Sequence, residues 1–209
     1  VEINEVFIHL TSLTKPKTLN HLWLAPFALQ KELVKAIRRE AAIARQGRAA
    51  KIIAKMNSLT DESVIRALYA ASADGVDIQL IVRGACALRP GVPGLSENIR
   101  VRSVVGRFLE HSRIYYFRND LAHDVYLASA DWMNRNLFRR VEVAFPVLDG
   151  ALKKRVINEG LLPYLKDNVN AWELNSDGTY HKRKPRAKQA PFCAQAHLAR
   201  LLGTPSDGR

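Results

Sequence analysis

The stretch from Lys51 to Gly84 decides the fold, and it reads KIIAKMNSLTDESVIRALYAASADGVDIQLIVRG. It begins with a short apolar run, Lys51–Met56, of the kind that forms a buried strand. Thr60 then caps a predicted helix that has acidic residues in its first turn. Val76–Val82 is the next strand, with alternate apolar residues on one face. A strand, a helix and a second strand with short joints predict a parallel crossover unit.

The elements on either side extend this unit into a larger sheet. On the amino-terminal side, Val6–Thr11 alternates and predicts a strand, and Pro26 opens a helix with apolar residues at four-residue steps. The fold class is therefore α/β, a mixed β-sheet flanked by helices. On the carboxyl-terminal side we expect strands at 99–104, 113–117, 125–130 and 141–147. A helix at 152–165, a hairpin at 172–181 and a short final helix at 194–202 are expected to follow.

This order of elements divides the chain into three parts. Residues 1–25 form a lead-in strand and loop, and residues 26–167 form the main domain. The character of the sequence changes at residue 168, where a turn at Asn175–Gly178 predicts a hairpin. A basic run, Lys182–Lys188, follows the hairpin. Residues 168–209 are therefore expected to form a hairpin with a basic carboxyl-terminal tail.

Charge is the strongest bulk signal in the composition. The 209 residues include 32 Lys and Arg against 20 Asp and Glu, which gives a formal net charge of +12 and a pI near 10.0. A field of this sign attracts polyanions such as nucleic acid, an anionic membrane or a phosphate polymer, and it does not choose among them. No window approaches the roughly 18 unbroken apolar residues of a membrane-spanning helix.

The two cysteines, Cys86 and Cys193, indicate the cellular compartment in which the protein works. Two cysteines in a chain of this size favour reduced thiols over a disulfide framework. We therefore expect a cytoplasmic protein, free or associated with a membrane surface. No cluster of residues has the spacing of a zinc site, so no metal ligand is predicted. The first residue is Val1 and not Met, so we expect this sequence to be a piece of a longer protein.

Polar residues follow the two strands of the crossover unit at their carboxyl ends, which is where open α/β sheets bind ligands. Lys55 and Asn57 end the first strand, and Arg83 ends the second. The guanidinium of an arginine offers planar, paired donors suited to phosphate. An arginine in this position also occurs as a surface residue or in a structural ion pair, so the position alone does not assign a site.

A second polar group lies further along the chain. His111 and Arg113 are two residues apart, so an extended backbone places both on one face. Ser129 and Asn134 flank a turn that follows another predicted strand. A histidine acts as nucleophile or proton donor near neutral pH, and a neighbouring cation binds phosphoryl oxygens. A lone histidine is more often structural, but this combination favours a reactive site.

These residues carry a resemblance to known families. His111-x-Arg113 followed by Ser129-x-Asp131-Trp132 resembles a degenerate half of the phospholipase D signature, whose usual form is His-x-Lys. A set of longer strings is more specific, and together they resemble polyphosphate kinases of the histidine-phosphorylating type. The likeness covers most of the chain, from about Pro26 to Arg183. The strings are Ile52–Leu59, Leu80–Gly84, Leu88–Gly91, Phe108–Arg113 and Ser129–Met133.

The resemblance implies that residues 26–167 are the phospholipase-D-like C-terminal catalytic domain of an enzyme with four domains. Members of this family transfer the terminal phosphate of ATP reversibly to inorganic polyphosphate, with magnesium. A histidine in a His-Ala-Lys motif of their third domain becomes phosphorylated. This chain contains no His-x-Lys, so that histidine lies outside it. We therefore expect the isolated chain to bind phosphate polymers weakly and to turn over little or nothing.

The resemblance also implies roles and partners. His111 acts as proton donor or electrostatic partner opposite the phosphohistidine, and Arg83 neutralises charge on the moving phosphoryl group. The implied partners are inorganic polyphosphate, ATP or ADP, the missing N-terminal domains and further copies in a homo-oligomer. Magnesium and the nucleotide belong to the complete enzyme, and this chain alone requires no cofactor. The remaining candidates bind phosphate, and they are Arg113, Lys55, Asn57, Ser129 and Asn134.

Two other functions stay open at this point. A phosphodiesterase or nuclease of the true phospholipase D type needs two complete motifs, which a symmetric dimer of this chain would supply. A non-catalytic polyanion-binding module would use the net charge and the basic run Lys182–Lys188. In that second case His111 would be dispensable.

Overall fold

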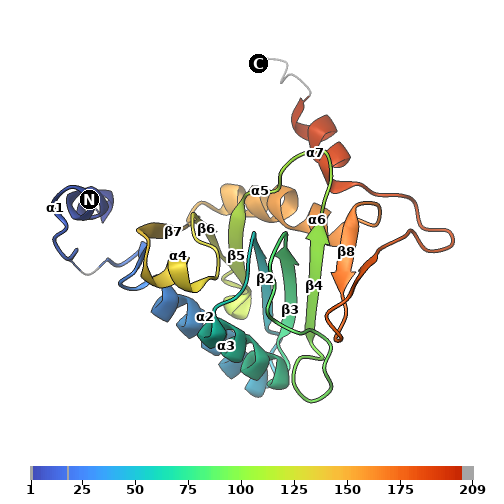
Figure 1. Cartoon of the computed structure of the whole chain (residues 1–209), viewed down its shortest axis with the longest axis horizontal. Coiled ribbons are helices and arrows are strands. Elements are labelled where there is room, and N and C mark those ends of the chain that lie inside the picture. Colours follow the sequence, from blue (N-terminus) through green and yellow to red (C-terminus); the bar gives the residue numbers. More distant parts are fainter. Residues whose placement is uncertain (1, 18, 204–209) are drawn as a thin grey trace.

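The computed structural model describes residues 2–17 and 19–203. Within them, one mixed sheet of nine strands runs in the order β1-β7-β6-β5-β2-β3-β4-β8-β9, with helices on both faces (Figure 1). The predicted fold class, a mixed α/β sheet flanked by helices, is confirmed. The strands are β1 (Trp23–Ala25), β2 (Lys51–Met56), β3 (Asp77–Val82), β4 (Ile99–Val104), β5 (Arg113–Phe117), β6 (Asp124–Ala128), β7 (Glu142–Pro146), β8 (Ala171–Leu174) and β9 (Tyr180–Lys182). The helices are α1 (Glu2–Ser12), α2 (Leu29–Arg45), α3 (Glu62–Ala73), the 3-10 turn η1 (Asn119–Leu121), α4 (Asn134–Phe138), α5 (Gly150–Gly160), α6 (Leu162–Lys166) and α7 (Ala194–Gly203).

The crossover unit at the centre of the sheet folds as predicted. β2 and β3 pair in parallel, and α3 connects them. The helix is capped by Asp61 and not by Thr60, because the Asp61 carboxylate accepts a hydrogen bond from the backbone N–H of Val64 at 3.0 Å. A carboxylate at this position satisfies an otherwise unpaired donor and suits the positive end of the helix dipole.

The hairpin of β5 and β6 lies beside β2 in the middle of the sheet. β5 pairs antiparallel with β2, with Ile114 opposite Lys55, so β5 begins where β2 ends. β3 and β4 run parallel to β2 and end at the same side. We name this side the carboxyl edge: it is where β2, β3, β4 and β6 end and β5 begins. Ligand sites of open α/β sheets lie at such an edge.

Each face of the sheet has its own hydrophobic core. Ile52 belongs to the core beneath α2 and α3, with Leu33 among its neighbours. The next residue, Ile53, belongs to the opposite core beneath α5, α6 and α7, with Leu161. Burial on both faces explains why β2 is an almost continuous apolar run. The helices on the two faces can be followed in Figure 1.

The strand predicted at Val6–Thr11 is wrong, because these residues belong to α1. The apolar residues Ile3, Val6, Phe7 and Leu10 recur at the three- and four-residue spacing of a helix, and this pattern is longer than the alternation over Val6–Thr11. Of the residues of α1, Val6 is the buried one, while the Phe7 side chain is 61% exposed.

The helix predicted from Pro26 begins three residues later, at Leu29. Pro26 follows a cis peptide bond and lies in a turn, in which the backbone N–H of Ala28 donates to the carbonyl of Leu24 at 2.7 Å. The proline therefore belongs to the turn that leads into α2, and the predicted apolar face of the helix is otherwise confirmed.

The single helix predicted at 152–165 is two helices, α5 and α6, which meet at Leu161. Pro163 lies in the first turn of α6. Because a proline has no backbone N–H and its ring occupies the space of the preceding turn, α5 cannot continue through it. The hairpin of β8 and β9 and the final helix α7 are confirmed.

The Glu2 carboxylate ties α1 to the segment that leads into β1. Glu2 accepts hydrogen bonds from the backbone N–H groups of Leu22, Asn20 and His21, at 2.9, 2.7 and 3.1 Å. These bonds, that of Leu22 above all, lower the pKa of Glu2 to about 2. In Figure 1, α1 lies to one side of the sheet and its helices.

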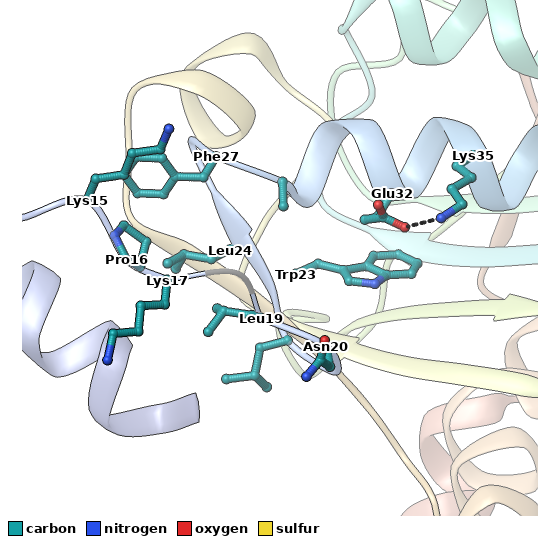
Figure 2. Close-up of a pocket in the computed structure, with 12 residues that line it drawn as sticks. Lys15, Pro16, Lys17, Leu19, Asn20, Trp23, Leu24, Phe27, Glu32 and Lys35 are labelled. Carbon is teal, nitrogen blue, oxygen red and sulfur yellow. Dashed lines mark hydrogen bonds and ion pairs between the residues drawn. The ribbon is translucent and has the colours of Figure 1, made fainter. Parts of the chain in front are cut away.

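A cavity of about 400 Å³ lies where the lead-in segment meets α2. Figure 2 shows Trp23 and Phe27 among its lining residues and the ion pair of Glu32 with Lys35 beside it. The lining residues come from the lead-in, β1 and α2, and none of the predicted site residues is among them. The cavity therefore belongs to the attachment of the lead-in and not to the carboxyl edge.

The sheet draws its strands from all three predicted parts of the chain. β1 lies within 1–25, while β8 and β9 lie within 168–209. The three-part division itself stays a prediction. Among the described residues, none of the helices combines the length and the apolar character that crossing a bilayer demands.

Candidate active site

Arg83 and His111 lie together at the carboxyl edge. Arg83 follows β3 directly, and His111 lies two residues before β5. Arg83 Nη1 donates to the carbonyl oxygen of Glu110 at 2.7 Å and lies 3.5 Å from Nδ1 of His111. The His111 side chain is exposed, and Arg83 is half-buried. A guanidinium carries five N–H donors, so these contacts leave donors for an anion at the same place.

The loop that carries His111 is held by a residue from the carboxyl-terminal helix. Gln195 of α7 accepts a hydrogen bond from the backbone N–H of Phe108 at 3.0 Å and donates to its carbonyl at 2.7 Å. The same amide donates to the Glu110 carboxylate at 2.7 Å. A Cβ on Gly106 would lie 2.4 Å from Oε1 of Gln195, so this close approach requires a glycine. Gln195 therefore fixes the segment just before His111.

Lys55 lies beneath this loop and not on its open side. Its ammonium is 2.7 Å from the Glu110 carboxylate and 3.3 Å from the centre of the Tyr164 ring, and the side chain is 3% exposed. Burial lowers the pKa of Lys55, and the hydrogen bond and charge of Glu110 oppose that shift. Burial works to raise the pKa of Glu110, but Lys55 and Gln195 outweigh it, so this pKa lies below its usual value. Lys55 and Glu110 therefore each favour the charged form of the other against the effect of burial.

Arg113 forms a second buried pair with Asp131. Its Nε and Nη2 lie 3.2 and 3.3 Å from the two carboxylate oxygens, and Nη1 donates to the backbone carbonyl of His111 at 3.1 Å. Asn57 completes the group, since its backbone N–H donates to Asp131 at 2.8 Å. Two-point pairing of a guanidinium with a carboxylate fixes orientation as well as distance. Arg113 thus positions the backbone of His111 from inside the sheet.

Ser129 and Asn134, the other predicted phosphate ligands, lie in different surroundings. The Ser129 hydroxyl donates to the carboxylate of Glu142, which also accepts from the side-chain amide of Asn136 at 2.7 Å. Asn136 is buried, whereas Asn134 begins α4 and is exposed. The polar turn after β6 is therefore organised around Glu142, which the sequence did not single out.

The open groups of this site suit an anion. Glu110 and Asp131, the carboxylates nearest His111, are already paired with Lys55 and Arg113. Magnesium prefers unpaired oxygen ligands, so these residues do not fit a magnesium site. Among residues 2–17 and 19–203, no group of three or more His, Cys, Asp or Glu side chains is placed to hold a metal ion. The donors that face outward are N–H groups, which bind phosphoryl oxygens.

The sequence identified the outward residues of the site and missed most of their supports. Glu110 and Asp131 lie within the quoted motifs, so their neighbours in the sequence point to them. Glu142 and Gln195 lie on β7 and α7, far from any motif. No local pattern marks Gln195, because its role depends only on where α7 packs.

Comparisons with known proteins bear on the family. A family model described as polyphosphate kinase C-terminal domain 2 matches residues 22–195. The polyphosphate kinase of Burkholderia lata is 58% identical over 183 residues, which are 88% of this chain and 27% of that protein. The polyphosphate kinase of Xylella fastidiosa is 52% identical over 201 residues, 96% of this chain and 29% of that protein. The chain thus spans less than a third of the length of these curated relatives.

The fold agrees with the same family. The crystal structure of the polyphosphate kinase from Porphyromonas gingivalis superposes with a TM-score of 0.91 and 38% identity, over 97% of this chain and 31% of that one. The resemblance first seen in the motifs is therefore confirmed over nearly the whole chain. By family model, sequence identity and fold alike, the chain belongs to the polyphosphate kinase family and corresponds to its second C-terminal domain.

Proposed function

We propose that this chain supplies one half of the active site of a polyphosphate kinase, which transfers the terminal phosphate of ATP reversibly to inorganic polyphosphate. The observation that carries the proposal is the 3.5 Å approach of Arg83 Nη1 to His111 Nδ1 on an exposed edge. Arg83 donates in this contact and Nδ1 of His111 accepts, so the remaining N–H groups of Arg83 and the other ring nitrogen of His111 are left for the oxygens of one phosphoryl group. The family supports the same reaction class, and because the chain spans less than a third of its relatives, the activity of the whole protein is part of the proposal.

The proposed reaction has two steps. In the first, the bond between the terminal phosphorus of ATP and its bridging oxygen breaks, ADP leaves with the electron pair, and a phosphorus–nitrogen bond forms with a histidine elsewhere in the enzyme. In the second, a terminal oxygen of polyphosphate attacks the phosphorus, and the phosphorus–nitrogen bond breaks. The polymer grows by one phosphate, and the reverse direction uses the same bonds.

Arg83 and His111 act on the phosphoryl group as it moves. Its charge is spread over three oxygens, and catalysis depends on positioning the group and stabilising that charge. The Arg83 guanidinium is oriented by the Glu110 carbonyl, so it meets those oxygens without rearrangement. The exposed imidazole of His111 donates a hydrogen bond or a proton from the side opposite the phosphohistidine.

The other predicted phosphate ligands receive a supporting role in this proposal. Lys55, Arg113 and Ser129 already pair with Glu110, Asp131 and Glu142, and we assign them to holding the backbone of the site. Asn57 acts with them through Asp131, and Asn134 is exposed and available to a ligand. Direct phosphate binding by these five residues stays a prediction.

Magnesium and the nucleotide belong to the complete enzyme in this proposal. The carboxylates around His111 are paired with cations, so we assign magnesium to the phosphates of ATP and to residues outside this chain. We further propose that the chain works in the cytoplasm, joined to amino-terminal domains and to further copies of the enzyme. The isolated chain requires no cofactor to fold.

Replacing the two outward residues in the full-length enzyme tests the proposal. His111→Ala and Arg83→Ala should each lower ATP-dependent polyphosphate synthesis about 100-fold or more, the usual effect of removing one preorganised donor. Arg83→Lys should recover only part of the rate, because a lysine lacks the paired donors of the guanidinium. Synthesis and the reverse formation of ATP should fall together.

The matched control is Lys154→Ala, which removes an exposed cation from α5, away from the carboxyl edge. It should leave the rate unchanged, and circular dichroism should show all variants folded. Near-normal synthesis by both His111→Ala and Arg83→Ala would refute the site. Cleavage of nucleic acid by the isolated chain that is lost in His111→Ala would favour the phosphodiesterase instead.

A further inference from the structure

A second cationic feature lies on the flank of the sheet, over β4, β8 and β9. It is a cavity of about 370 Å³, which we name the basic cavity. Its lining contains six lysines and arginines, one histidine and one carboxylate, which is Glu173. The lining residues are Arg100, Arg102, Glu173, His181, Lys182, Arg183, Lys184 and Arg186.

Strand register gathers four of these side chains on one face. Arg102 lies opposite Glu173, and Glu173 lies opposite His181, so the three share a face across β4, β8 and β9. Arg100 lies two residues before Arg102 on β4 and shares that face. Over the rest of the sheet, α5, α6 and α7 pack against this same face. Arg102 lies at the border of these helices, because its guanidinium donates to the carbonyl of Leu165 at the end of α6.

The cations of the basic cavity outnumber their counter-charges. Glu173 is its single carboxylate, and it lies 3.6 Å from Arg102, 3.3 Å from Arg183 and 3.6 Å from His181. Burial lowers the pKa of Arg102, and the charges of Arg183 and Arg100 add to that shift, while Glu173 and, from outside the lining, Asp167 oppose it. Like charges at this density repel one another in the absence of an anion, so an anion that enters relieves the repulsion.

The side chains that line the basic cavity also indicate which class of anion it binds. Single-stranded nucleic acids are held by aromatic side chains on which the bases stack. Apart from His181, the residues that line the basic cavity include no aromatic side chain. Arginine and lysine donors without stacking surfaces suit an unbranched anion whose whole length is phosphate.

We propose that the basic cavity binds a segment of inorganic polyphosphate away from its reacting end, and so tethers the polymer to the enzyme. The proposal rests on the function proposed above, because that function supplies the polymer. It adds a binding site that takes no part in the bond changes at Arg83 and His111.

The path from the basic cavity to the reactive residues is short and follows the strands. From Arg100 to Val104, where β4 ends, four residues of strand span about 13 Å. Val104 lies at the carboxyl edge and pairs with Ala171, whose carbonyl accepts the backbone N–H of Arg183 at 2.8 Å. The basic run after β9 therefore reaches the same edge. A polymer long enough to span this path occupies both places at once, so affinity should rise with chain length.

Binding of polyphosphate to the 209-residue chain tests the proposal. The variant R100Q/K184Q/R186Q removes three exposed cations that line the basic cavity. The control K31Q/R38Q/K154Q removes three exposed cations from α2 and α5, so both variants have the same net charge. We expect the first variant to bind long polyphosphate about tenfold more weakly and the control to bind within about twofold of the parent. Inorganic triphosphate, which is too short to span the path, should discriminate less.

Salt dependence gives a second measurement on the same proteins. Each phosphate contact contributes about 0.7 to the slope of log affinity against log salt for a single-stranded polyanion, so this slope should fall by about 2 in R100Q/K184Q/R186Q.

Equal losses of affinity in both triple variants, or a loss in neither, would overturn the tether. If either triple variant is unfolded, Lys184→Glu against Lys154→Glu makes the same comparison with one charge. Displacement of polyphosphate by an equal charge concentration of single-stranded DNA would overturn the choice of occupant.

The two proposals fail in different ways. If the tether is wrong and the reaction right, His111→Ala still abolishes synthesis in the full-length enzyme while the two triple variants bind alike. If the site is wrongly assigned and the tether right, His111→Ala keeps synthesis while R100Q/K184Q/R186Q still loses affinity.

Discussion

Two cationic regions of the same sheet are built in opposite ways. At the carboxyl edge, Lys55 pairs with Glu110 and Arg113 pairs with Asp131, one cation to one carboxylate. In the basic cavity, six lysines and arginines face the single carboxylate of Glu173. Pairing fixes side chains in place, whereas unpaired charge attracts a ligand without fixing its geometry. The two proposals thus assign positioning for the reaction and attraction of the polymer to separate places on this domain.

Breaking a pair at the carboxyl edge should have the largest effect on folding. Lys55→Met leaves the Glu110 carboxylate buried without its cation, since the two side chains are only 3% and 12% exposed. We expect a loss of about 3 kcal/mol in the free energy of unfolding, as for other pairs broken from one side. Urea denaturation of the parent and the variant measures it.

The double variant Lys55→Met/Glu110→Leu is the control for that prediction. It removes both charges together, and replacing a buried pair with apolar residues is often neutral or stabilising. Most of the lost stability should therefore return. A loss below about 1 kcal/mol in Lys55→Met alone would mean that pairing does not set this region apart from the basic cavity.

Loosening the loop without touching a charge should have a smaller effect. Gln195→Ala removes the hydrogen bonds to Phe108 and Glu110, and we expect a loss of about 1–2 kcal/mol. Hydrogen exchange should speed up in the segment between β4 and β5 and stay unchanged in β2 and β3. Gln189→Ala, an exposed glutamine before α7, is the matched control. Uniform acceleration across the sheet would contradict a local clamp.

Lowering the pH should reduce the free energy of unfolding modestly through the carboxyl edge and not through the basic cavity. The pKa of Glu110 in the folded protein lies below its usual value of 4.5, so its contribution to stability is present above that pH and is lost as the pH falls. Glu110→Gln should therefore reduce the slope of unfolding free energy against pH between about pH 5 and about pH 3. Lys184→Gln, in the basic cavity, should leave that slope unchanged. Identical slopes in the parent and Glu110→Gln would contradict the lowered pKa.

The smallest effect on stability should come from the basic cavity itself. Arg183 shares Glu173 with Arg102, so Arg183→Gln removes repulsion from Arg102 together with one attraction. We expect a change within about 0.5 kcal/mol in thermal or urea unfolding, as for partly exposed pairs. Arg113→Gln, which breaks the pair with Asp131, should cost several times more. Equal costs for the two substitutions would remove the contrast between the regions.

Local patterns predicted most of the fold and the outward half of the site. The crossover unit follows from the residues between Lys51 and Gly84, because apolar spacing and turn residues act over short distances. The meeting of Arg83 with His111 follows from the rule that strand ends converge. The helix at Val6–Thr11 was missed because a longer helical pattern competes there with a short alternation.

The inward half of the site could not be predicted in the same way. Lys55 stays a predicted phosphate ligand, but no local pattern indicated that Glu110 and Tyr164 from distant segments enclose its ammonium. Gln195 lies after a basic run with no motif around it, and its position depends on the packing of α7. Residues whose roles depend on long-range packing leave no local pattern in the sequence.

The insertion of β5 beside β2 also bears on the order in which the chain assembles. Arg83 belongs to the crossover unit, whose contacts are close in sequence, whereas His111 reaches its place only when β5 closes a long loop and pairs with β2. Contacts across long loops form late, because the entropy of closing the loop opposes them. A newly made chain should therefore form the crossover unit that carries Arg83 before His111 joins it, so the proposed site is complete only when β5 has paired with β2.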